Sequence, residues 1–286
     1  MSAPPFALSN TLSPAQLSTT EKRALAVSEL HKYARAITVK VRSTDSWGSG
    51  ILIQRQGLVY TVVTNEHVLQ PRKQHTVQTH DGIIYSASTV TAINFQNNDL
   101  AVLQFHSPNK VYSTALLAEN ETLVVGNEVF AAGFPADADT SQTTEFKFTD
   151  GNVTFVTDKA LDGGYQVGYT NAVEKGMSGG PVLNLRGEVV AINGMHAHPL
   201  WGDPYVFKDG SKPCAPIYEL MVKSSWAISI ATFIQLFPKS SARQNSNSMR
   251  SLQISSQVKN SQQLPLEILQ MRTKAEAAKK CMRLDT

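Results

Sequence analysis

The sequence predicts an all-β protein, either a sandwich or a barrel, with helices near its two ends. Short runs of β-branched and aromatic residues recur about every ten residues, turn residues separate the runs, and almost no helical periodicity lies between them. The chain has 286 residues, of which 42% are hydrophobic and 17% charged. This is the composition of an ordinary globular protein with a sizeable core.

The first part of the chain, residues 1–33, predicts a loose arm followed by a helix. Good helix formers with apolar residues at helical spacing, such as Leu25 and Leu30, place that helix at about 20–36. The stretch before Lys22 has no basic residue and no sustained apolar run. We therefore expect no signal peptide and take the cytoplasm as the default compartment, with export left open.

Residues 34–237 are expected to form the main domain. Apolar and polar residues alternate over 37–42, as in a half-buried strand, and residues 47–64 indicate a hairpin with its turn at 55–57. Further strands are expected at residues 76–79, 83–86, 89–93, 100–105, 128–132, 151–157, 166–169, 181–185, 188–193 and 226–230, and a short helix at 231–237.

Residues 238–286 predict a flexible polar linker that ends in an amphipathic helix. This segment lacks aromatic residues and glycine, and its first half is rich in Ser, Gln and Asn. It holds nine Lys or Arg and three Asp or Glu, so the rest of the chain, from totals of 26 and 23, is slightly acidic. A nucleic-acid partner is therefore not expected, while the basic helix is available for contact with a partner or a surface. No segment is long enough and apolar enough for a transmembrane helix.

No metal or organic cofactor is expected. The two cysteines, Cys214 and Cys281, lie outside any C-x-x-C pattern, which argues against a zinc knuckle and predicts two free thiols. His196 and His198 could suggest a metal site, but few carboxylates lie near them in the sequence, and a loop that lines the cleft is favoured.

The stretch Gly176–Pro181 contains a candidate nucleophile, Ser178, between glycines. A serine hydroxyl attacks only where a base takes its proton and donors await the oxyanion. Glycines permit such a backbone, and the amides of Gly176 and Ser178 are candidate oxyanion donors. The pattern alone is more typical of a glycine-rich turn between strands.

Two upstream residues supply the partners that such a serine needs. His67 follows an apolar strand and Asp99 precedes another. Taken alone, each is typical of a structural residue, but the order His, Asp, Ser at strand ends fits a catalytic triad. The base removes and returns the hydroxyl proton, and the carboxylate fixes its tautomer.

Three motifs in this order resemble the chymotrypsin-fold, trypsin-like serine proteases, above all bacterial peptidase domains such as those of cyanobacteria. They are TNEHV at 64–68, NDLAVL at 98–103 and GMSGGPV at 176–182. The resemblance implies two six-stranded antiparallel β-barrels, with the active site in the cleft between them.

The resemblance also implies roles for single residues. His67 would be the general base, Asp99 its orienting carboxylate and Ser178 the nucleophile of a serine endopeptidase that cleaves polypeptides through an acyl-enzyme. The amides of Gly176 and Ser178 would form the oxyanion hole.

Other positions concern substrate binding and activation. Ala172 would form the base of the primary specificity pocket, which predicts a small or apolar P1 residue. Gly194, Met195 and His196 match the segment that pairs with the substrate backbone. Met177 replaces the aspartate on which zymogen activation depends in secreted relatives, so that activation is not expected.

Two alternatives belong to other classes. An esterase or lipase would use the Ser178 stretch as a nucleophile elbow, but that fold needs a helix after the serine and a histidine later in the chain. Here Pro181 and a strand–turn–strand pattern follow. A non-catalytic scaffold that binds peptides is the second alternative.

Overall fold

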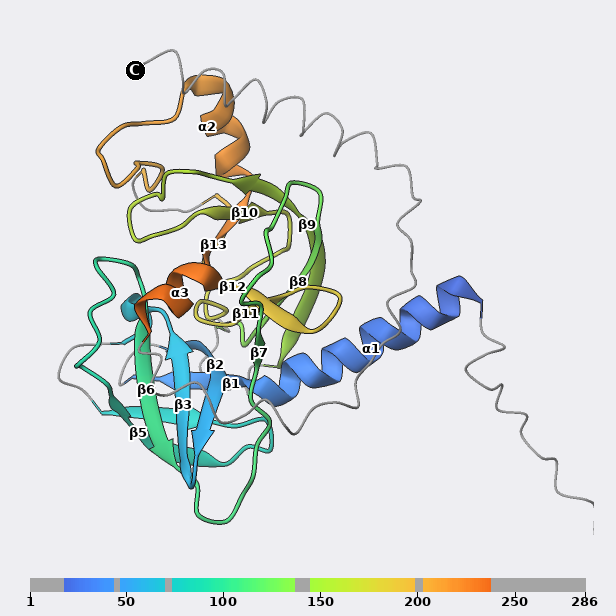
Figure 1. Cartoon of the computed structure of the whole chain (residues 1–286), viewed down its shortest axis with the longest axis vertical. Helices are drawn as coiled ribbons and strands as arrows, with labels where there is room; N and C mark the ends of the chain where they lie inside the picture. The colour runs from blue at the N-terminus through green and yellow to red at the C-terminus, as the bar shows by residue number, and fades with distance from the viewer. Residues whose placement is uncertain (1–17, 44–46, 70–73, 137–144, 199–202, 238–286) are drawn as a thin grey trace, which may run out of the picture.

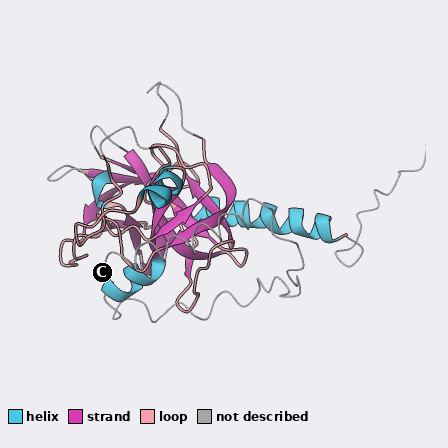
Figure 2. Cartoon of the chain, turned by 90° about the horizontal axis from the view of Figure 1, so that it is seen from above, coloured by secondary structure: helices cyan, strands magenta, loops and turns pink. Residues whose placement is uncertain are grey.

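Two β-barrels make up most of the computed structural model, which describes residues 18–43, 47–69, 74–136, 145–198 and 203–237. The first barrel lies below the second in Figure 1, and the N-terminal helix projects to one side. Figure 2 shows the same strands gathered at the centre, with one helix projecting from them. The predicted all-β class with two six-stranded antiparallel barrels is therefore confirmed.

The first barrel closes in the order β1-β2-β3-β6-β5-β4, and all its pairings are antiparallel. Its interior is filled by alternate strand residues, among them Val39, Leu52, Tyr60 and Leu103, all fully buried. Its strands are β1 (Thr38–Arg42), β2 (Trp47–Gln56), β3 (Val59–Thr64), β4 (His75–Gln78), β5 (Ile84–Thr89) and β6 (Ala101–His106).

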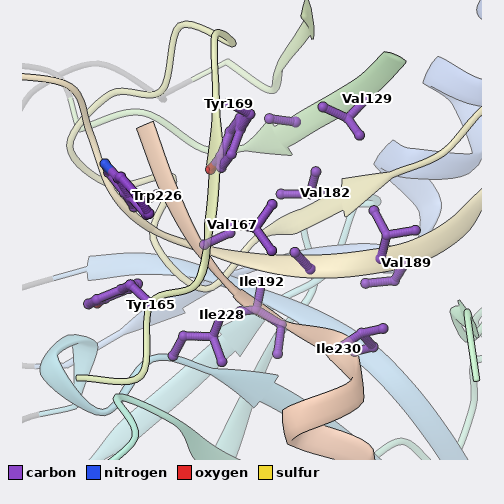
Figure 3. Packing of buried hydrophobic residues seen from close by; sticks show 14 of the residues in the cluster. Val129, Tyr165, Val167, Tyr169, Val182, Val189, Ile192, Trp226, Ile228 and Ile230 are labelled. Atoms are coloured by element: carbon purple, nitrogen blue, oxygen red, sulfur yellow. The ribbon is translucent and has the colours of Figure 1, made fainter. Parts of the chain in front are cut away.

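The second barrel closes because β11 and β12 pair at the two ends of the order β11-β8-β9-β10-β13-β12. Figure 3 shows how Val129, Val167, Ile192 and Ile228 from different strands meet in its core. A short parallel strand, β7 (Leu116–Leu117), adds to β12 from outside this ring. The other strands are β8 (Glu128–Gly133), β9 (Lys147–Val156), β10 (Val167–Tyr169), β11 (Pro181–Leu183), β12 (Glu188–Met195) and β13 (Ser225–Ser229).

The N-terminal helix, α1 (Thr19–Ile37), agrees with the expected helix at 20–36. Leu30, Ala34 and Ile37 are buried on one face and pack into a hydrophobic cluster that includes residues of both barrels, while the first turns project from the body (Figures 1 and 2). The helix therefore crosses the boundary that we placed between residues 33 and 34. None of the helices in the described ranges is long and apolar enough to cross a membrane.

Several local expectations differ from the structure. The strand expected at 89–93 is a turn after Thr89, because Val90 and Ile93 pack on the core from a loop that leads β5 into β6. Helix α2 (Ala215–Val222) and strand β7 were not expected, whereas α3 (Ile230–Leu236) agrees with the helix expected at 231–237.

The cysteine prediction was also wrong. Cys214, which precedes α2, is disulfide-bonded and not a free thiol. Spacing along the chain does not determine which sulfurs a fold brings within bonding distance. The predicted linker and terminal helix at 238–286 lie outside the described residues.

Candidate active site

His67 lies in a single 3-10 turn, η2 (Glu66–Val68), directly after strand β3. Asn65 precedes the turn, and its side-chain amide donates to the backbone carbonyl of Asp99 at 2.8 Å. The side chain of Val68 is buried, while that of His67 is 49% exposed. The turn is thus anchored on one side and leaves the imidazole accessible on the other.

Asp99 lies in the loop before β6 and holds the imidazole through two contacts. Its Oδ2 is 2.5 Å from Nδ1 of His67, and the backbone N–H of His67 donates to Oδ1 at 2.9 Å. Burial raises the pKa of the Asp99 carboxyl, but the hydrogen bonds and charge of His67, with a hydrogen bond from Tyr165, together hold that pKa below its ordinary value. An ionised Asp99 favours the imidazole tautomer with its proton on Nδ1 and a basic Nε2.

Ser178 lies on a loop before β11 whose backbone requires glycine. Gly176 and Gly179 have φ angles of 95° and 85°, and a Cβ on Gly176 would lie 2.5 Å from the amide nitrogen of Ala136. Within the part of the chain that the structure describes, the amides of Gly176 and Ser178 donate no hydrogen bond. Both are therefore available to an anionic ligand.

The Ser178 hydroxyl donates to the backbone carbonyl of Gly194 in β12, with an Oγ–O distance of 3.0 Å. No hydrogen bond joins Ser178 to His67 in the structure as described. The structure therefore joins His67 to Asp99, and Ser178 to Gly194, without a direct bond between the two pairs.

Residues at the start of β2 connect the loop of Ser178 to the strand that leads to His67. A Cβ on Gly48 would lie 2.5 Å from Val68 Cγ2 and 3.0 Å from the Ser178 carbonyl, so the histidine turn and the serine loop meet at this glycine. The amide of Ser49 donates to the Ser178 carbonyl at 2.7 Å, and the carbonyl of Ser49 accepts from Thr64 Oγ1 at 2.7 Å.

The side chain of Ser49 makes two further bonds across the barrels. Its fully buried hydroxyl donates to the carbonyl of Gly176 at 2.9 Å and accepts from the amide of Phe134 at 2.9 Å. Ser49 thereby ties the peptide of Gly176 to the end of β8.

The candidate substrate-binding residues fall in two places. Ala172 is exposed, close in sequence to the serine loop, whereas Gly194 and Met195 are buried at the end of β12 and His196 is half-buried beyond it. The β12–β13 register shifts between residues 193 and 195, so Gly194 lies at an irregularity of the sheet. Met177 is fully buried. Among the described residues, no three His, Cys, Asp or Glu side chains gather where they could hold a metal ion.

Reasoning from the sequence missed Tyr165 and Ser49. The Tyr165 hydroxyl donates to Asp99 Oδ2, although the two residues lie 66 positions apart. Neither residue stands in a motif, and only the packing of the two barrels brings each to the site.

Comparison with known proteins places the chain in a family. The model of the trypsin-like peptidase domain matches residues 48–192, just over half of the chain. The serine protease Do-like HtrA of Bacillus subtilis (strain 168) is 31% identical over 192 residues, and the serine protease HTRA3 of Rattus norvegicus is 32% identical over 179 residues. These alignments cover 64% and 60% of this chain but only 41% and 38% of the two relatives.

Solved structures agree on the fold. The serine endoprotease from Yersinia pestis has a TM-score of 0.53 at 23% identity, over 73% of this chain and 64% of that one. Deg5 has a TM-score of 0.55 at 20% identity, over 77% of this chain and 94% of that one. The chain therefore belongs to the trypsin-like peptidase domain family and has the chymotrypsin-type serine protease fold.

Proposed function

We propose that the chain is a serine endopeptidase in which Ser178 is the nucleophile, His67 the general base and Asp99 the carboxylate that orients the base. The observation that carries the proposal is the 2.5 Å contact between His67 Nδ1 and Asp99 Oδ2, which leaves Nε2 as the basic nitrogen. Membership of the peptidase family supports it, as do the names of the relatives, which are serine proteases.

The reaction proceeds through an acyl-enzyme. Oγ of Ser178 forms a bond to the carbonyl carbon of the scissile peptide while its proton passes to Nε2 of His67. The C–N bond then breaks, the leaving amine takes that proton, and the acyl group stays on Ser178. A water molecule repeats both steps, which releases the acid and restores the serine.

Two features of the loop favour this chemistry. The amides of Gly176 and Ser178, which donate no hydrogen bond to any described residue, are donors for the oxyanion that forms in each half of the reaction. Before attack, the Ser178 hydroxyl has to give up its bond to the Gly194 carbonyl and donate to His67.

We assign the substrate backbone to Gly194, Met195 and His196, which would add the peptide as a strand beside β12. We assign the base of the P1 pocket to Ala172. An alanine offers no carboxylate to an Arg or Lys side chain, so the preferred P1 residue is small or apolar. A cleavage-site profile on a peptide library tests this: a dominant Arg or Lys at P1 would contradict it.

Labelling with a fluorophosphonate probe tests the nucleophile. The protein should be labelled at Ser178, and Ser178→Ala should abolish both labelling and casein cleavage while the thermal unfolding curve stays close to that of the wild type. Equal labelling of the Ser178→Ala protein would refute the mechanism.

The same experiment separates the alternatives. The elbow of an α/β-hydrolase is already excluded, because β11 follows the Ser178 loop where that fold needs a helix. Labelling without cleavage of any peptide would favour an esterase on the present fold, and absence of labelling would favour a scaffold that binds peptides.

We also propose that residues 34–237 are the protease unit, preceded by the arm and helix at 1–33 and followed by a basic tail at 238–286. The proposed role of that tail is contact with a partner or a surface, which its excess of Lys and Arg favours.

A further inference from the structure

We propose that Tyr165 is a positioning residue of this active site, which holds the Asp99 carboxylate in the orientation that His67 requires. The Tyr165 hydroxyl donates to Asp99 Oδ2, the same oxygen that contacts Nδ1 of His67. A carboxylate oxygen has two lone pairs and accepts both donors at once. The inference rests on the proposed function and adds a residue that the triad reaction itself does not include.

The ring of Tyr165 fits because residue 194 has no side chain. A Cβ on Gly194 would lie 2.1 Å from Cε1 of Tyr165 and 2.8 Å from its hydroxyl oxygen. Gly194 is also the residue whose carbonyl accepts from Ser178. Tyr165 therefore packs between Asp99 and the strand that holds the serine hydroxyl, at one side of the buried cluster in Figure 3.

The backbone around Tyr165 is fastened to the loop of Asp99. The amide of Asp99 donates to the carbonyl of Gly163 at 2.8 Å, and the amide of Leu161 donates to the carbonyl of Tyr165 at 2.8 Å. A Cβ on Gly164 would lie 2.1 Å from Oδ1 of Asn98, so the tight turn closes directly on that loop. Backbone hydrogen bonds thus hold the segments of both Asp99 and Tyr165 in place, so the folded backbone itself brings the hydroxyl to the carboxylate.

The charges around Asp99 give the contact a measurable consequence. The titratable groups that face Asp99 are His67 and Tyr165, and those that face Tyr165 are Asp99 and Tyr169. Burial, and then the charge of Asp99, raise the pKa of Tyr165, so its hydroxyl remains a donor at neutral pH. The hydroxyl takes up part of the negative charge that would otherwise stabilise protonated His67. Its removal should therefore favour the protonated base.

Tyr165→Phe removes the donor and keeps the ring. With a short peptide substrate, we expect kcat to fall about tenfold, the size typical of one hydrogen bond to a charged group. KM should stay within about twofold, because no substrate contact is lost. The acid limb of the kcat/KM profile should move to higher pH, because the Asp99 carboxylate then directs more of its negative charge at His67.

A second readout does not depend on activity. In the Ser178→Ala background, the low-field proton NMR signal of His67 Nδ1–H reports its bond to Asp99. Adding Tyr165→Phe should shift that signal. Gly194→Ala is the second variant in case Tyr165→Phe does not fold, because its Cβ would displace the ring and should shift the same signal.

Tyr169→Phe is the matched control. Tyr169 is fully buried and its hydroxyl donates to Asn193 Oδ1 at 2.6 Å, so the same substitution removes one buried hydrogen bond without touching Asp99. We expect a lower melting temperature, with kcat and the acid limb unchanged.

The outcomes separate the two proposals. The proposed function stands if the wild type cleaves peptides and Ser178→Ala does not. The role of Tyr165 is refuted if, in that case, Tyr165→Phe leaves kcat, the acid limb and the NMR signal unchanged. Equal kinetic changes in Tyr169→Phe would also refute it, since they would reflect a general loss of packing. If the wild type cleaves nothing, the proposed function fails, and the NMR signal still decides whether Tyr165 acts on Asp99.

Discussion

Substitution of Ser49 by alanine should damage the loop of Ser178 from a distance. The Ser49 hydroxyl bonds to two backbone groups, the buried carbonyl of Gly176 and the half-buried amide of Phe134, both at 2.9 Å. Ser49→Ala leaves both without that partner. An unsatisfied buried group costs about 1 to 3 kcal/mol, and water can partly satisfy the half-buried amide of Phe134. We therefore expect a loss of about 2 kcal/mol, and a melting temperature lower by roughly 4 to 8 °C.

Activity should fall as well, because the bond to the Gly176 carbonyl fixes the backbone dihedrals of Gly176, and these dihedrals also set the direction of the Gly176 N–H in the preceding peptide unit. We expect kcat/KM for a short peptide to fall by about 10- to 100-fold, less than the loss of a whole oxyanion donor. The measurements are thermal unfolding and steady-state hydrolysis on the same preparation.

Ser224→Ala is the matched control for that experiment. The buried Ser224 hydroxyl also has two partners, Thr154 Oγ1 at 2.9 Å and the carbonyl of Leu220 at 3.2 Å, but it makes no contact with the serine loop. It should lose stability and keep its kcat/KM. If Ser49→Ala likewise loses stability but stays within about twofold of wild-type kcat/KM, the reasoning about Gly176 is wrong.

Gly176→Ala should lower kcat/KM by about 10²- to 10³-fold, because a Cβ has no room beside Ala136; near-normal hydrolysis would contradict this. The folded-state pKa of Asp99 is lowered, so its contribution to stability is present above about pH 4 and is lost as pH falls through the folded value. In denaturant titrations from pH 5 to 3, the free energy of unfolding of Ser178→Ala should therefore fall more than that of Ser178→Ala with Asp99→Asn. Parallel curves for the two variants would contradict this role of Asp99. Deletion of residues 239–286 should leave hydrolysis of a short peptide unchanged. The full-length and the truncated protein should both carry Cys214→Ser, so that neither has the disulfide of Cys214. A large loss of hydrolysis in the truncated protein would make the tail part of the active unit.

Much of the fold could be predicted because strand patterns are local. Alternating residues in 37–42 and the hairpin over 47–64 follow from a period of two and from turn chemistry, and the structure has β1, β2 and β3 there. The strand predicted at 89–93 was wrong, because local residue types do not distinguish a strand from a buried loop. Its β-branched residues favour a strand, but a loop that packs on the core uses the same residue types.

The sequence by itself determined the all-β class and the candidate residues His67, Asp99 and Ser178, because each candidate stands in a short motif beside a strand that its own residues specify. The two barrels were expected only from the resemblance that these motifs carry. Only the tertiary structure decided how these residues are supported. Ser49 meets Gly176 across 127 positions, and Tyr165 meets Asp99 across 66. Such contacts depend on how two closed barrels pack against each other, and local propensity carries no information about that packing.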